Sequence, residues 1–61
     1  MEIVKGTHIV KIKETTNNGF VATHVQLFND GNQTQERVIN TKFGYATEKA
    51  AVKWANKQLG I

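Results

Sequence analysis

Apolar and polar residues alternate along two stretches in the first half of the chain, at 7–14 and 20–28. The alternating apolar residues are Val10 and Ile12 in the first stretch, and Val21, Val25 and Leu27 in the second. A period of two residues is typical of a β-strand with one buried face, so both stretches are predicted to be strands. A third, less regular strand is predicted over 33–41, and residues 1–4 are able to begin or extend a strand.

The segments 15–19 and 29–32 are rich in Asn and Gly, which tolerate the positive φ of tight hairpin turns. A two-residue loop at 17–18 would place Val10 opposite Val25. This register gives the sheet one apolar face and one mixed polar face, because side chains alternate between the two faces.

The same register places His8 and His24 on opposite faces of the sheet. We therefore expect the two imidazoles not to share a metal ion or a substrate.

A helix is predicted near the C-terminus. Thr47 is suited to cap its first turn, Glu48 complements the positive end of the helix dipole, and Gly60 supplies the left-handed residue that ends it. The residues expected to face the sheet are Ala51, Trp54, Ala55 and Leu59. The predicted fold class is α+β: a three-stranded antiparallel β-meander with one C-terminal helix packed on one face, forming a single domain over 1–61.

The composition indicates which cross-links, membrane segments and cell compartment to expect. Its 61 residues include no cysteine, so neither a disulfide nor a thiolate metal site is expected. No long apolar run marks a membrane span or a signal peptide, so we expect a cytoplasmic protein without a membrane partner. Met1 is consistent with a true start, and the chain is expected to be complete.

The net charge of +3 is unevenly distributed. Residues 1–41 carry four basic and four acidic side chains, whereas residues 42–61 carry four lysines and one glutamate. This balance favours an anionic partner, such as nucleic acid or an acidic protein. The alternative is that the charge only keeps a small protein soluble.

The sequence offers little for catalysis. It has no serine or cysteine, its threonines have no paired base, and its acidic residues do not occur as pairs at ligand spacing. We therefore expect no enzyme activity, no metal site and no cofactor.

Two surfaces are candidates for binding. The first is the sheet face away from the helix, where basic and amide side chains would reach base edges in a DNA groove. The predicted nucleic-acid contacts on this face are Lys11, Lys13, His24, Gln26 and Arg37. The predicted dimer contacts on the same face are Ile9, Phe20 and Phe28. The alternative is an ordinary solvated face.

The second surface is a row of three lysines on the helix. The four-residue spacing of Lys49, Lys53 and Lys57 aligns their ammonium groups on one side of the helix, where they would track phosphates or an acidic protein. The alternative is that the row is the solvated side of an amphipathic helix.

Three short strands are followed by Phe43-Gly44-Tyr45-Ala46-Thr47-Glu48-Lys49-Ala50 and then by Trp54-Ala55. This layout resembles the small arm-site-binding N-terminal domains of phage-type integrases, and also small uncharacterised bacterial and phage β-β-β-α domains. The integrase resemblance implies a sheet that enters the major groove of DNA, with the helix packed behind it. The leading hypothesis is thus a small non-enzymatic binding module that binds DNA or RNA through its sheet face. The competing hypothesis is a protein-interaction or homodimerisation module.

Overall fold

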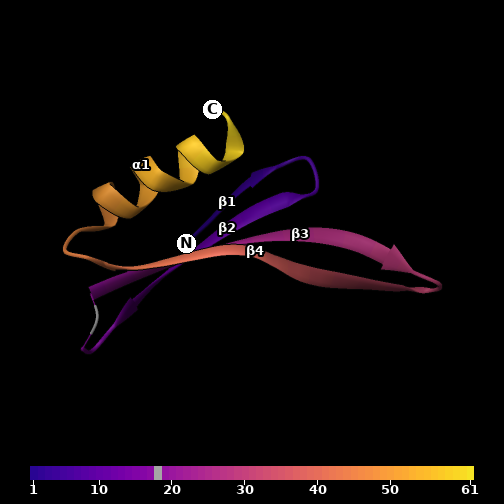
Figure 1. Cartoon of the computed structure of the whole chain (residues 1–61), viewed down its shortest axis with the longest axis horizontal. Coiled ribbons are helices and arrows are strands. Elements are labelled where there is room, and N and C mark those ends of the chain that lie inside the picture. Colours follow the sequence, from indigo (N-terminus) through magenta and orange to yellow (C-terminus); the bar gives the residue numbers. More distant parts are fainter. Residues whose placement is uncertain (18) are drawn as a thin grey trace.

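The computed structural model describes residues 1–17 and 19–61. These form β1 (Glu2–Lys5), β2 (His8–Thr15), β3 (Gly19–Asp30), β4 (Gln33–Tyr45) and α1 (Glu48–Leu59). The strands make one antiparallel sheet in the order β1-β2-β3-β4, and α1 covers one of its faces (Figure 1). The α+β class, the antiparallel meander and the C-terminal helix are confirmed. The expected number of strands was wrong, because the described residues form four.

The additional strand, β1, is only four residues long, too short for a clear alternation of apolar and polar residues. Gly6 has a φ of 61°, a left-handed conformation that turns the chain back so that Val4 pairs with Ile9. The Met1 amino group adds a hydrogen bond of 3.1 Å to the carbonyl oxygen of Ile12.

The predicted register between β2 and β3 was wrong by one residue. Thr15 pairs with Gly19, and as a result Val10 lies opposite His24 rather than Val25. The predicted loop included Asn18, which lies outside the described residues. Gly19 has a φ of 65°, so a glycine takes the left-handed position and the pairing closes one residue earlier on β2. A shift of one residue exchanges the two faces of β3.

The hydrophobic core lies between α1 and the sheet. Its buried members are Val10, Ile12, Ala22, Ala51, Ala55 and Leu59, and the partly buried residues packed against them are Ile3, Phe20, Tyr45, Val52 and Trp54. The helix side of the core is therefore as predicted. The β3 side was wrong, because Ala22 rather than Val21, Val25 and Leu27 faces the helix.

Both ends of α1 are capped as predicted. Thr47 Oγ1 accepts a hydrogen bond of 3.2 Å from the backbone N–H of Ala50. At the C-terminal end, Gly60 has a φ of 72°, its N–H donates to the Lys57 carbonyl, and the Ile61 N–H donates to the Asn56 carbonyl. This pair of bonds is the Schellman motif, which satisfies carbonyl groups that a helix end leaves unpaired.

The β3–β4 hairpin extends well past the helix (Figure 1). Its distal residues, 28–37, are all exposed, and the register between the two strands shifts at two places nearer to the helix. Among the described residues, the only helix is too short to cross a membrane.

Candidate interaction surfaces

The sheet face turned away from α1, called the open face below, carries a row of branched aliphatic side chains. Val4 pairs with Ile9, Ile9 with Val25, and Val25 with Val38, so that the row crosses all four strands. Val4 and Val38, at the two ends, are 59% and 62% exposed. Val25, in the middle, is only 3% exposed although it is not part of the core cluster beneath α1. We refer to these four residues as the aliphatic row.

The charges on the open face are balanced. Glu2 of β1 lies opposite Lys11 of β2 in the strand register. Lys13 of β2 and Glu36 of β4 lie on the same face, because side chains alternate between the two faces of a strand. The Lys11 ammonium forms a salt bridge of 2.5 Å with Glu36, and this hydrogen bond raises the pKa of Lys11. The stabilisation from this exposed pair is complete below the unfolded-state pKa of lysine and is lost as the pH rises through the raised pKa.

The predicted nucleic-acid contacts do not form one surface. Lys11 and Lys13 lie on the open face, whereas His24 and Gln26 alternate onto the helix side of β3. Arg37 pairs with Gln26 and donates a hydrogen bond of 3.4 Å to its Oε1. Their expected common face was wrong, because the one-residue change of register turned the β3 side chains over.

The predicted dimer contacts are divided in the same way. Ile9 lies on the open face as a member of the aliphatic row. Phe20 is partly buried against the core beneath the helix, and Phe28 is exposed on the distal hairpin. The expectation that these three side chains share a surface was therefore wrong for Phe20 and Phe28.

The two histidines lie on the same side of the sheet, contrary to prediction. His8 Nδ1 is 2.9 Å from His24 Nε2, and His24 Nδ1 is 3.3 Å from Gln58 Oε1. An amide oxygen only accepts, so a neutral His24 carries its proton on Nδ1 and accepts through Nε2. His8 then donates from Nδ1. This chain of hydrogen bonds satisfies the buried His24 ring, which is 5% exposed.

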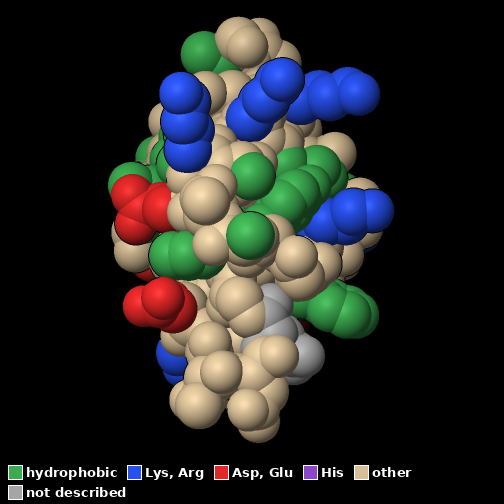
Figure 2. All heavy atoms as spheres, turned by 90° about the vertical axis from the view of Figure 1, so that its left-hand side faces the viewer, with side chains coloured by type: hydrophobic (Ala, Val, Ile, Leu, Met, Phe, Trp, Pro, Cys, Tyr) green, Lys and Arg blue, Asp and Glu red, His purple; other side chains and the backbone are tan. Residues whose placement is uncertain are grey.

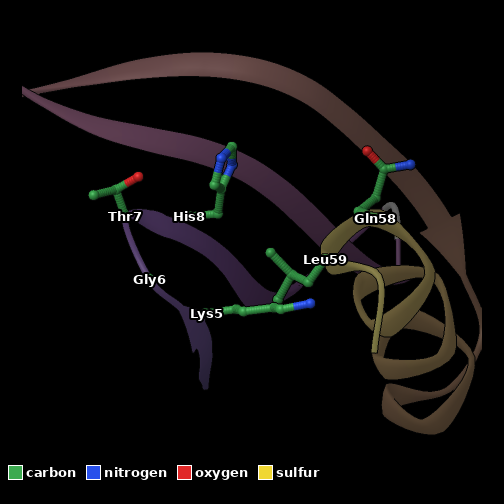
Figure 3. A pocket seen from close by; sticks show the side chains of 6 residues that line it. All are labelled: Lys5, Gly6, Thr7, His8, Gln58 and Leu59. Atoms are coloured by element: carbon green, nitrogen blue, oxygen red, sulfur yellow. The ribbon is translucent and has the colours of Figure 1, made fainter.

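A cavity of about 480 Å³ opens beside His8, between the β1–β2 hairpin and the end of α1 (Figure 3). It is lined by Lys5, Gly6, Thr7, His8, Gln58 and Leu59. The Lys5 ammonium donates a hydrogen bond of 3.3 Å to the carbonyl oxygen of Gly60, so it also caps the C-terminal end of the helix. Within residues 1–17 and 19–61, no three His, Cys, Asp or Glu side chains are grouped to hold a metal ion.

Lys49, Lys53 and Lys57 are all exposed on the outer side of α1, and we call them the lysine stripe. Figure 2 shows Lys and Arg side chains gathered over the helix at the top of the view, with acidic side chains lower down. None of the three makes a salt bridge with another described residue. The α1 cap and its buried Ala51, Ala55 and Leu59 hold the stripe outward.

The lysine stripe was predicted from the sequence, whereas the aliphatic row was not. A signal was present in the adjacent Ile9 and Val10, because two neighbouring apolar residues in a strand point to opposite faces. Comparison with known proteins adds no relative: the chain matches no family model, and no curated protein or solved structure is significantly similar to it.

Proposed function

We propose that the protein is a small non-enzymatic binding module that binds nucleic acid through the lysine stripe of α1. The observation that supports this proposal is the concentration of charge. Residues 42–61 carry the whole net charge of +3, and Lys49, Lys53 and Lys57 form one exposed row there. Neighbouring like charges on a helix repel one another, so helix stability does not explain the row.

The dimensions of the stripe suit a phosphate backbone. Lys49 and Lys57 are eight residues apart, which corresponds to about 12 Å along the helix axis. Over that distance one strand of duplex DNA presents about three or four phosphates. Flexible lysine side chains therefore have enough phosphates within reach for one contact each.

Binding of DNA through the sheet, as the integrase resemblance implies, has less support than binding through the helix. It needs basic and amide side chains together on one sheet face. The open face offers Lys11 and Lys13, and Lys11 is already paired with Glu36. The stripe keeps its three lysines unpaired within the described chain, so more charge is available there for phosphates.

The test is a titration of labelled duplex and single-stranded DNA, first at low salt and then at higher salt. Two variants each remove two positive charges: Lys49→Gln with Lys53→Gln on the stripe, and Lys11→Gln with Lys13→Gln on the open face. We expect the stripe variant to lose most of the binding and the open-face variant to bind almost as the wild type does. These substitutions replace exposed or partly exposed side chains, and circular dichroism checks that the fold is retained.

Two outcomes would overturn the proposal. The first is absence of binding to either form of DNA at low salt, where phosphate contacts are strongest. The second is a loss of binding confined to the open-face variant, which would show that DNA binds to the sheet and not to the helix. Absence of DNA binding, together with binding of an acidic polypeptide by the wild type but not by the stripe variant, would identify the stripe as a protein-binding surface instead.

A further inference from the structure

The aliphatic row has no role in the proposed nucleic-acid contact. It lies on the sheet face opposite α1, and its end members Val4 and Val38 are among the most exposed apolar side chains of the described chain. Ile9 of the row is partly exposed and Val25 is buried, while Val21 and Leu27 alternate onto the same face of β3 and are partly exposed. Exposed apolar side chains gathered on one face of a small protein are typical of an interaction surface.

We propose that the open face packs against the open face of a second copy of this chain. The product is a symmetric dimer in which two sheets stack through their aliphatic rows and the two helices lie on the outside. Such a contact is isologous, since the same residues come from both copies, and it closes after two chains.

The charge distribution favours a second copy over an anionic partner. Among the described residues, two lysines and two glutamates lie on the open face, so it does not repel itself. The excess positive charge lies on the other side of the molecule, on the lysine stripe. Stacking through the open faces therefore keeps the two stripes far apart, while an anionic partner is steered to the helices instead.

The size of the face is suited to a weak dimer. The extents of the molecule are 39, 25 and 16 Å, and the helix and the sheet are stacked along the 25 Å extent (Figure 1). The open face therefore spans 39 by 16 Å, a footprint of roughly 600 Å², compared with about 800 Å² per partner in a specific interface of standard size. Contact over most of the sheet is thus required, and the row that crosses all four strands is placed to provide it.

The sheet edges are less suited to pairing with another chain. On β4 the register to β3 shifts between Phe20 and Ala22 and again between His24 and Val25. Such irregularities interrupt the regular row of backbone donors and acceptors that edge pairing needs. The other edge, β1, has only four residues.

The experiment is sedimentation of the full chain over a wide concentration range, up to about 1 mM. We expect a concentration-dependent mass that reaches twice the 6.8 kDa of one chain. Val38→Lys introduces a charge into the row at a side chain that is exposed in the monomer, so folding is retained. It should weaken the dimer by roughly tenfold or more. The matched control is Ile61→Lys, at a side chain that is 69% exposed beyond the helix, and it should leave the dimer unchanged.

A strictly monomeric wild type would overturn the inference, and so would equal effects of Val38→Lys and Ile61→Lys. Assemblies that grow beyond two chains would also overturn it, because a face-to-face contact closes at the dimer. The DNA titration is a separate measurement, so a monomeric wild type would leave the proposed role of the lysine stripe unaffected.

Discussion

At the scale of single residues, Gly19 sets the register between β2 and β3, because it pairs with Thr15 at the end of the hairpin. Its φ is 65°, and a Cβ placed on it would lie 2.3 Å from the Tyr45 carbonyl oxygen. Gly19→Ala should therefore lower the free energy of unfolding by about 2–5 kcal/mol, through backbone strain and overpacking. The control is Gly31→Ala, where φ is 67° but nothing lies within 4 Å, and it should cost only the strain of about 1–2 kcal/mol. Chemical denaturation measures both, and equal losses would contradict the close approach to Tyr45.

The contact between His8 and His24 gives a second residue-scale test of the register. The register predicted from the sequence would place the two rings on opposite faces of the sheet. A double-mutant cycle with His8→Ala and His24→Ala should give a coupling energy of about 0.5–3 kcal/mol, as for side chains in direct contact. Additive losses in denaturation experiments would mean that the rings do not touch.

At the scale of elements, the helix was predictable and the sheet register was not. The signals for α1 are local: Thr47, Glu48 and Gly60 lie next to the positions they cap, and apolar residues repeat at helical spacing. The register depends instead on which turn residue takes the left-handed conformation and on the distant carbonyl of Tyr45. For the same reason the lysine stripe was found from sequence, whereas the aliphatic row, assembled from four strands, was not.

The distal end of the β3–β4 hairpin should be the least stable part of the sheet. Its distal residues, 28–37, are exposed and lie beyond the helix, while Val10 and Ile12 are buried beneath it. Amide hydrogen exchange followed by NMR should therefore be faster in the distal hairpin than in the centre of β2 by more than roughly tenfold. Uniform protection along β3 would show that another contact stabilises the hairpin.

At the scale of the whole molecule, charge and exposed aliphatic surface are separated. The lysine stripe lies on the outer side of α1, and the aliphatic row lies on the far face of the sheet. The stripe and the row face opposite sides of the molecule, so one short chain presents two chemically distinct surfaces. In the proposed dimer the aliphatic surface is buried and both stripes stay accessible to nucleic acid.

The salt dependence of DNA binding tests the role of the stripe most directly. Three lysine–phosphate contacts predict that log K falls with log salt with a slope of about −3 per chain, and that each lysine lost reduces the steepness by about 1. The Lys49→Gln and Lys53→Gln double variant should therefore give a slope of about −1, while the Lys11→Gln and Lys13→Gln double variant should keep that of the wild type. An unchanged slope in the stripe variant, with a shallower one in the open-face variant, would contradict binding through α1.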